Sequence, residues 1–305
     1  MPNAYPSTVT VNVGALSIED VVAVARYGAK VEIAPEALEE VAATRERVEE
    51  LAQDPTPVYG ISTGFGALAR RHIPEEMRAQ LQLSLVRSHA AGTGPEVEEE
   101  VIRALMLLRL STLCTGRTGV RPVVVETYAK ALNAGIVPVV REYGSLGCSG
   151  DLAPLAHCAL ALLGEGEVRV NGELKDAGDA LAAAGIEPLQ LREKEGLALI
   201  NGTDGMLGQL CLAITDLRAA AKTADIATAM TVEGLLGTLV VFADDLQQLR
   251  PHPGQADAAA NILQVAEGSE ILEAALEEFK KNQVQDAYSV RCAPQVAGGF
   301  RDTLA

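Results

Sequence analysis

The segment Val101–Cys114 constrains the fold of this chain more than any other, because it has almost no polar side. Its sequence, VIRALMLLRLSTLC, is apolar around nearly the whole circumference of a helix. A helix at the protein surface keeps one polar face, whereas a helix that is apolar all round is enclosed by other elements. The segment therefore predicts the interior of a helical bundle.

Helical spacing of apolar residues returns in other segments and becomes the dominant pattern from about residue 75 onward. Pro35 opens one such segment, which Asp54–Pro57 ends, and Pro122 marks another break. We predict a mainly α chain, a long helical bundle with a small mixed α/β N-terminal part and a surface that meets other subunits. The apolar positions with this spacing are Leu38, Val41, Val48, Leu51, Leu207, Leu210, Cys211, Ile214, Leu217, Ile271, Leu272, Ala275, Leu276 and Phe279.

Two segments carry strand signals. Thr8–Val13 alternates apolar and polar residues, as a short half-buried strand does. Glu167–Val170 is followed by Asn171-Gly172, the favoured pair for a two-residue type I′ turn, and then by Glu173-Leu174. We predict a small β-hairpin there.

Charge and composition exclude several classes of protein. The chain has 25 Lys and Arg against 41 Asp and Glu, a net charge of −16, whereas non-specific nucleic-acid binding needs a basic surface. No run approaches the roughly 18 apolar residues of a membrane span, and Met1–Thr10 does not resemble a signal peptide. The five cysteines contain no CxxC pair, so we expect neither a disulfide framework nor a zinc site, and a cytoplasmic protein.

Three local patterns resemble chemical motifs but favour plainer interpretations. Gly64–Ala69 matches GxGxxA, yet no clear strand precedes it, so a glycine-rich loop is the better interpretation. Ser149, Asp151 and His157 do not have the spacing of a nucleophile elbow and its partners. Asn201–Thr203 is formally a glycosylation sequon without a secretory signal. The four histidines have no metal-ligand spacing, and no metal site is expected.

Four patches rich in Gly, Ser and Thr interrupt the helical pattern. Such loops lower helix stability, and functional groups concentrate on loops held by a rigid scaffold. Composition leaves a shared site and simple helix connections about equally supported. The patches are Tyr59–Gly66, Ser88–Gly94, Gly144–Asp151 and Asn201–Gly205.

At these patches the chain resembles the histidine ammonia-lyase family, within the wider group of aromatic amino-acid ammonia-lyases and aminomutases. The matching motifs run in order over most of residues 55 to 300 and are too dense for chance. The resemblance implies the long helical bundle of the aspartase/fumarase type. The motifs are YGISTGFG (59–66), SHAAG (88–92), GSLGCSGDLAPL (144–155), EGLALINGT (195–203) and QDAYSVRC (285–292).

The resemblance implies a built-in cofactor. In this family an internal tripeptide cyclises and loses water to give 4-methylideneimidazol-5-one (MIO), and here the tripeptide would be Cys148-Ser149-Gly150. Gly150 has no Cβ, so its nitrogen can approach the Cys148 carbonyl, and Ser149 loses its hydroxyl to leave the methylene group. We expect Asp151 to cap a helix that starts at Leu152. No dissociable cofactor is implied.

The resemblance also implies roles for side chains that bind or deprotonate an amino-acid substrate. Tyr59 would take the β-proton of the substrate. Arg291 would hold its carboxylate through a bidentate contact. Asn201 would support the same region and the MIO oxygen, and Tyr288 and Gln285 would complete the pocket.

His89 bears on the choice of substrate. Histidine-specific members of the family have Ser-His where this chain has Ser88-His89, and phenylalanine-specific members have a bulkier apolar pair. We therefore expect L-histidine as substrate, with trans-urocanate and ammonia as products, at the first step of histidine breakdown. Tyrosine-specific relatives also use a histidine here, so a phenylalanine or tyrosine lyase or an aminomutase stays open.

Three departures from the family pattern bear on activity. Family members continue beyond the point that matches Ala305 through helices that supply a Phe and a Glu to the site, so we expect a fragment, a shortened product or one piece of a split protein. Ala297-Gly298 stands where histidine-specific members usually have His-Gly, and Leu272–Gln283 is a smoother helix than usual. A catalytically incomplete fragment that forms oligomers is therefore an alternative.

The resemblance finally implies a domain boundary and an assembly. We expect an N-terminal domain that bears the MIO over residues 1–200, and the start of a central helical bundle over residues 201–305. In the family the site is shared among the subunits of a homotetramer, with Tyr59, Asn201 and the segment Gln285–Arg291 coming from different chains. We accordingly expect a homo-oligomer.

Overall fold

The computed structural model describes residues 5–282 and 284–305, and the chain forms two compact units. The first extends to Leu212 and the second begins at Ala213, so the boundary falls within helix α9 (Asp204–Gly234). Each unit is described by itself.

The first unit is built mainly from helices joined by short strands. Its helices are α1 (Ile18–Tyr27), α2 (Pro35–Gln53), α3 (Glu75–His89), α4 (Glu99–Cys114), α5 (Pro122–Asn133), α6 (Leu152–Leu162), α7 (Ala177–Ala183), α8 (Glu195–Ile200) and the start of α9. Its strands are β1 (Thr8–Val11), β2 (Lys30–Ile33), β3 (Thr93–Glu96), β4 (Ile136–Pro138), β5 (Arg141–Tyr143), β6 (Glu167–Val170) and β7 (Glu173–Asp176).

Helix α4 lies in the core of the first unit, as its apolar sequence predicts. It packs against α1, α2 and α5. Side chains on all sides of the helix are buried, including Leu105, Met106, Leu107 and Leu110. Burial of a leucine or methionine side chain contributes about 1.5–3 kcal/mol, so α4 supplies a large share of the stability of this unit.

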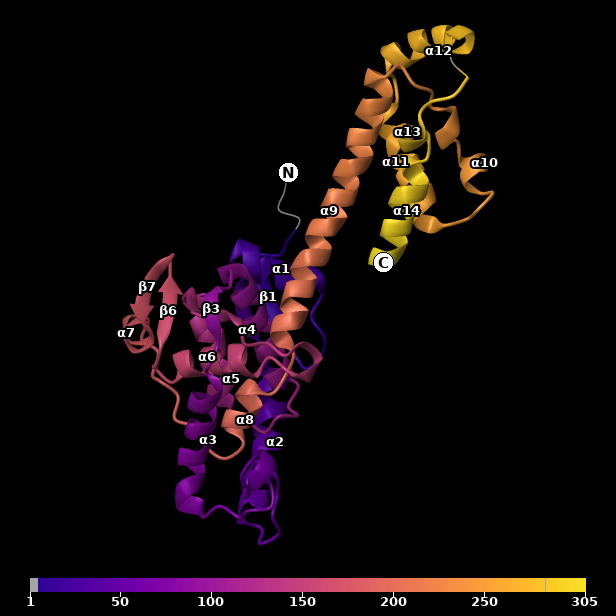
Figure 1. Ribbon diagram of the computed structural model, residues 1–305. Helices are drawn as coiled ribbons and strands as arrows, with labels where there is room; N and C mark the ends of the chain where they lie inside the picture. Colours follow the sequence, from indigo (N-terminus) through magenta and orange to yellow (C-terminus); the bar gives the residue numbers. More distant parts are fainter. Residues whose placement is uncertain (1–4, 283) are drawn as a thin grey trace. The chain divides into compact units, whose positions relative to one another are not determined.

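Three small sheets connect the helices of the first unit. β1 pairs in parallel with β2, β3 pairs antiparallel with β5, and β4, β6 and β7 form a three-stranded antiparallel sheet. The predicted hairpin is present as β6 and β7, beside α7 (Figure 1). Asn171 and Gly172 have φ values of 53° and 79°, as a type I′ turn requires. The predicted N-terminal strand ends at Val11 and not at Val13.

The second unit consists of helices around a smaller core. It contains the rest of α9, α10 (Asp244–Gln247), α11 (Pro253–Ala266), α12 (Glu270–Asn282), α13 (Tyr288–Arg291) and α14 (Ala293–Leu304). Helix α12 agrees with the prediction for Leu272–Gln283, although Gln283 and the side chain of Phe279 lie outside the described residues.

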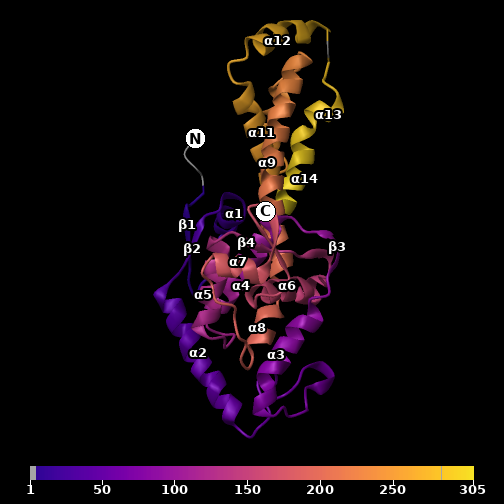
Figure 2. The same cartoon turned by 90° about the vertical axis from the view of Figure 1, so that its left-hand side faces the viewer.

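A buried carboxylate joins three helices of the second unit. Asp225 on α9 accepts a hydrogen bond of 2.8 Å from Asn261 on α11 and pairs with Arg301 on α14. α11 and α14 lie side by side (Figure 1 and Figure 2). A buried charge is costly unless it is paired, so these contacts fix the three helices together.

One helical stretch of the described chain, Glu195–Gly234, is long and apolar enough to cross a membrane by length and composition alone. Residues 201–203 separate α8 from α9 within this stretch. Long core helices of globular proteins have the same composition.

Candidate functional site

One buried side chain of α3 ties the first Gly/Ser/Thr-rich patch to α8, the helix that precedes the fourth patch. Gln82, which is 1% exposed, donates from Nε2 to the carbonyl oxygen of Gly60 at 3.4 Å. Its Oε1 accepts from the backbone nitrogen of Leu197 at 3.2 Å. Leu197 belongs to α8, which leads directly to Asn201. The loop that bears Tyr59 is therefore held against the helix that presents Asn201.

The other two patches join the same network. The backbone nitrogen of Asp151 donates to the carbonyl oxygen of Gly202 at 2.7 Å, which links the third patch to the fourth. The backbone nitrogen of Gly92 donates to Nε2 of His157 on α6 at 3.2 Å, and β3 pairs with β5 just before Gly144. The third and fourth patches are thus in direct contact, and the first and second are tied to elements that adjoin them within the same unit.

The tripeptide Cys148-Ser149-Gly150 lies in a tight turn. Gly147–Ser149 form a single 3₁₀ turn, and the backbone nitrogen of Gly150 donates to Gly147 O at 2.9 Å. Gly150 has φ 118° and ψ 151°, a conformation that side chains with a Cβ rarely adopt. Cys148 and Ser149 are exposed. The tripeptide is therefore part of a chain folded back on itself, with a glycine at the position of positive φ.

Asp151 stands at the N-cap position of α6, but the expectation that its side chain caps this helix is wrong. Its buried carboxylate makes no bond to the first turn of α6. It accepts instead from Ser145 Oγ at 2.5 Å and from the backbone nitrogen of Met206 at 2.9 Å. Met206 lies in the first turn of α9, where free amides and the helix dipole favour a negative charge. The carboxylate therefore caps α9, across the turn that holds the tripeptide.

Tyr59 and Asn201 both lie at the surface of the first unit. Tyr59 is 50% exposed, and its ring meets the ring of Phe65 edge-on, with centroids 6.0 Å apart. Asn201 is exposed and ends α8 at the C-cap position. Both side chains are therefore accessible to a small molecule from the solvent.

His89 is the last residue of α3, and its ring has a defined orientation. Nδ1 lies 2.9 Å from the carbonyl oxygen of Leu85 and 3.1 Å from Ser88 Oγ. A carbonyl oxygen only accepts, so Nδ1 carries a proton in this contact. The contacts of Nδ1 therefore fix the direction in which the other ring nitrogen, Nε2, is presented.

Gln285, Tyr288 and Arg291 lie in the second unit. Cζ of Arg291 stands 4.2 Å from the centroid of the Tyr288 ring, a cation–π contact within α13. Asp286 accepts from the backbone nitrogen of Thr238 at 2.9 Å, which fixes the segment before α13. Gln285 and Tyr288 are exposed, and Arg291 is half-buried. These three candidates are therefore gathered on one short segment.

Two positions in this network were not predicted from the sequence. Gln82 is a polar residue on a half-apolar helix, and only tertiary structure shows that it joins the first patch to α8. The sequence favours a structural role for His157, because Ser149, Asp151 and His157 do not have the spacing of a hydrolase triad. The structure places its Nε2 on Gly92 and the Asp151 carboxylate on Met206, so these residues do not form a triad. Gly64–Ala69 forms a loop with one 3₁₀ turn, as expected.

Ionic contacts fix the start of α8. Glu195 is fully buried, and its carboxylate accepts from Arg121 Nε at 2.8 Å and from Arg121 Nη2 at 2.9 Å. The backbone nitrogens of Arg121 and Arg192 donate to the same carboxylate.

Within residues 5–282 and 284–305, no cluster of His, Cys, Asp and Glu side chains has the arrangement of a metal site.

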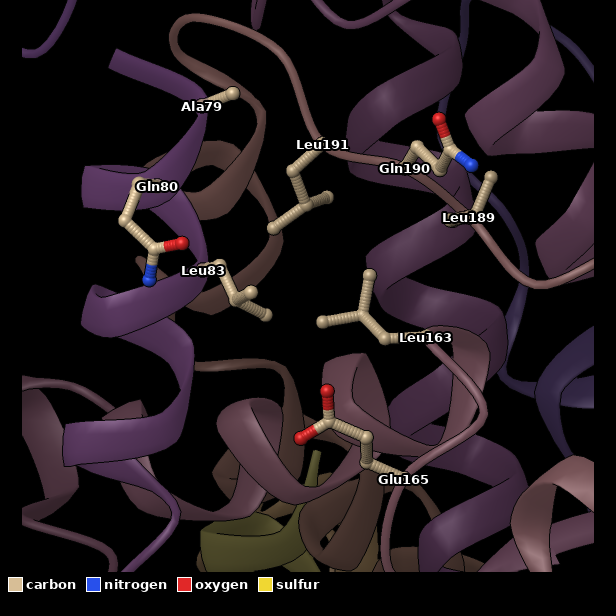
Figure 3. Close-up of a pocket in the computed structure, with 8 residues that line it drawn as sticks. All are labelled: Ala79, Gln80, Leu83, Leu163, Glu165, Leu189, Gln190 and Leu191. Carbon is tan, nitrogen blue, oxygen red and sulfur yellow. The ribbon is translucent and has the colours of Figure 1, made fainter. Parts of the chain in front are cut away.

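One cavity of the first unit lies away from the candidate residues. Its volume is about 300 Å³, and Leu83, Leu163 and Leu191 point toward one another across it (Figure 3). Glu165, its one charged lining residue, is already paired with Arg87 at 2.6 Å. A second cavity, of about 40 Å³, is lined in part by Ser145, Asp151 and Met206 behind the tripeptide turn. The larger cavity contains none of the predicted site residues.

Comparison with known proteins gives a consistent result. Residues 16–305 match the family model described as aromatic amino acid lyase. The chain is 60% identical over 299 residues to histidine ammonia-lyase of Streptomyces avermitilis, which covers 98% of this chain and 58% of that protein. The chain thus spans little more than half the length of that relative.

Solved structures agree with the fold. Tyrosine aminomutase from Streptomyces globisporus matches with a TM-score of 0.89 and 40% identity, over 97% of this chain and 59% of that one. Histidine ammonia-lyase from Trypanosoma cruzi matches with a TM-score of 0.86 and 37% identity, over 97% and 54%. The mainly helical fold predicted from the sequence is therefore the fold of these lyases and aminomutases.

Proposed function

The chain belongs to the aromatic amino acid lyase family, and from this premise we propose that it acts in eliminating ammonia from L-histidine to give trans-urocanate. The observation that carries the proposal is the 60% identity to a histidine ammonia-lyase over 98% of the chain. The imidazole of His89, oriented by its contacts at Nδ1, supports a substrate with a polar ring. Histidine breakdown in the cytoplasm is the corresponding physiological role.

We propose that Cys148-Ser149-Gly150 forms the MIO group. The tight turn and the φ of 118° at Gly150 support this assignment, because ring closure needs the nitrogen of Gly150 close to the carbonyl of Cys148. The ring supplies an electrophile that makes the amine of the substrate a better leaving group.

The side chains of this chain would carry the remaining tasks. Tyr59 takes the β-proton on its phenolate oxygen; the C–H electron pair becomes the new Cα–Cβ double bond as the C–N bond breaks and ammonia leaves. Arg291 holds the substrate carboxylate, with Tyr288 and Gln285 beside it. Asn201 orients the same region, and His89 contacts the imidazole of the substrate.

These groups are divided between two units of the chain, with Tyr59, His89, Asn201 and the tripeptide in the first. The segment Gln285–Arg291 belongs to the second. We propose a homotetramer in which Tyr59, Asn201 and the segment Gln285–Arg291 of one site come from different copies, as the family resemblance implies. A monomer in light scattering would then predict an inactive protein.

Mass and turnover measured on one sample test the proposal. The intact protein should weigh two waters less than its formula, with the deficit in the peptide that contains residues 148–150. The Ser149→Ala variant should have the full mass of its own unmodified formula. It should also form no urocanate, which is followed by ultraviolet absorbance. An unmodified wild-type mass would overturn the MIO assignment, and a modified protein without turnover would favour the catalytically incomplete fragment.

A tyrosine lyase or aminomutase is the second candidate, because the 40% identity to a tyrosine aminomutase exceeds the 37% to the trypanosomal histidine ammonia-lyase. Supplying each amino acid separately distinguishes the two. Product from tyrosine and none from histidine would replace our choice of substrate.

A further inference from the structure

Arg109 is a buried cation in the middle of α4, a helix that lies in the core of the first unit. Its side chain is 2% exposed. Removing a guanidinium from water is costly unless its hydrogen bonds are remade inside the protein. The partners of Arg109 therefore indicate what the fold gains from keeping a charge at this position.

Those partners flank the connection that carries Asn201. Nη1 of Arg109 donates to the carbonyl oxygen of Ala198, in the last turn of α8, at 3.0 Å. Nη2 donates to the carboxylate of Asp204, the first residue of α9. Thr112 Oγ1, one turn further along α4, lies 3.2 Å from the other Asp204 oxygen. One planar guanidinium thus holds both ends of the connection over residues 201–203.

The connection also runs directly over the guanidinium. A Cβ on Gly202 would overlap Nη2 of Arg109 and the Asp204 carboxylate, so the backbone approaches as closely as glycine allows. The carbonyl oxygen of Gly202 is held from the other side by the backbone nitrogen of Asp151. Asn201 is therefore attached to a segment fixed by α4 on one side and by the tripeptide turn on the other.

We infer that Arg109 is a positioning residue for Asn201: its fork sets the geometry of the α8–α9 connection, and through it the orientation of the Asn201 side chain toward the substrate. This inference rests on the proposed function of Asn201. A lysine at this position would keep the charge but offers no planar fork that reaches Ala198 and Asp204 together. Residue type as well as charge is therefore required.

Hydrogen exchange measured by mass spectrometry tests the clamp without requiring activity. Arg109→Lys should raise exchange of the backbone amides in residues 200–206 at least tenfold while other helices of the first unit keep the wild-type rate. Arg103→Lys is the matched control, because Arg103 lies on the same helix and donates to Val24 O, away from the connection. Its exchange over residues 200–206 should equal wild type.

Thr112→Val gives a milder second variant if Arg109→Lys does not fold. It removes the contact to Asp204 together with the hydrogen bond from Thr112 Oγ1 to Leu108 O within α4, and it should raise exchange in the same peptide by about threefold. Unchanged exchange over residues 200–206 in the folded variants, or an equal rise throughout the unit, would overturn the inference.

A double-mutant cycle tests the link to Asn201. If Arg109 acts through Asn201, Arg109→Lys should lower kcat/KM about tenfold or more in the wild-type background and less than about twofold in an Asn201→Ala background. Equal losses of kcat/KM in both backgrounds would show that Arg109 has a structural role and does not act through Asn201. Absence of turnover in the wild type would count against the proposed function, and the exchange measurement would still decide the inference.

Discussion

The carboxylate of Asp151 accepts a hydrogen bond of 2.9 Å from the backbone nitrogen of Met206, although Asp151 directly precedes α6 and Met206 lies in α9. The residue after the candidate tripeptide is thereby tied to a helix more than fifty positions further along the chain. The same residue donates its own backbone nitrogen to Gly202. The residue that follows the tripeptide is consequently joined both to the α8–α9 connection and to the first turn of α9.

Removal of this carboxylate should destabilise the first unit. Asp151→Ala removes the buried carboxylate that accepts from the Met206 amide and from the Ser145 hydroxyl. A hydrogen bond to a charged group contributes about 1.5–3 kcal/mol, so each lost bond should lower the free energy of unfolding by about that amount. Chemical denaturation should show the loss. Asp176→Ala is the control, since Asp176 caps α7 at an exposed position and should cost about 1 kcal/mol. An Asp151→Ala protein as stable as wild type would contradict the role.

The sequence predicted those elements whose signals are local. Three signals each act within one segment: the apolar surface all round α4, the Asn171-Gly172 pair, and Pro35 at the start of α2. Each element that they predict is present. The strand from Thr8 was predicted two residues too long, because pairing with β2 ends at Ile33. Alternation alone does not show where the partner strand stops.

The candidate site depended on long-range contacts that local patterns do not contain. Asp151 has the residue type and position of an N-cap, yet tertiary contacts direct its side chain to α9. Gln82 and Arg109 are polar residues on helices, and nothing in their neighbourhood along the chain identifies their partners. Only the family resemblance singled out Tyr59, Asn201 and the tripeptide.

Gly202→Ala should be strongly destabilising. The added methyl group would overlap the guanidinium of Arg109, which cannot move without breaking its buried pair with Asp204. Breaking a buried ion pair costs about 3–5 kcal/mol, which sets the upper range of the effect. Gly299→Ala is the matched comparison, because Gly299 lies within α14 and a Cβ there meets no atom within 4 Å.

The two alanine variants should therefore change stability in opposite directions. Gly299→Ala should stabilise the second unit by about 0.5–1 kcal/mol, since alanine is the better helix former. Thermal or chemical denaturation of both variants provides the measurement. A Gly202→Ala protein with wild-type stability would show that the connection has room for a side chain.

Stability of the first unit should decrease in mild acid through His157. Burial, followed by the nearby charge of Arg141, lowers the pKa of His157 below its ordinary value of 6.5. The folded protein therefore binds this proton less readily than the unfolded chain. The contribution of His157 to the free energy of unfolding is complete above pH 6.5. It is lost as the pH falls from 6.5 through the pKa that His157 has in the folded protein, at up to about 1.4 kcal/mol per pH unit.

Protonation of His157 would also remove the lone pair that accepts from the Gly92 nitrogen. His157→Gln should flatten the dependence of unfolding free energy on pH between about 5 and 7, because the titrating group is gone. His72→Gln, which changes an exposed histidine of the same unit, should keep the wild-type slope. An unchanged slope in His157→Gln would assign the acid sensitivity to other groups.

Tyr128→Phe should leave stability unchanged or raise it. Tyr128 is fully buried on α5, and within the described residues its hydroxyl has no hydrogen-bond partner. A buried hydroxyl without a partner has lost its hydration, so its removal should raise the free energy of unfolding by anything up to about 2 kcal/mol. Tyr128→Ala, which also removes the ring, should instead cost about 3–5 kcal/mol through the cavity it leaves. Urea denaturation of the two variants separates the contributions of hydroxyl and ring, and a loss of more than about 1 kcal/mol in Tyr128→Phe would reveal a hydrogen bond to that hydroxyl.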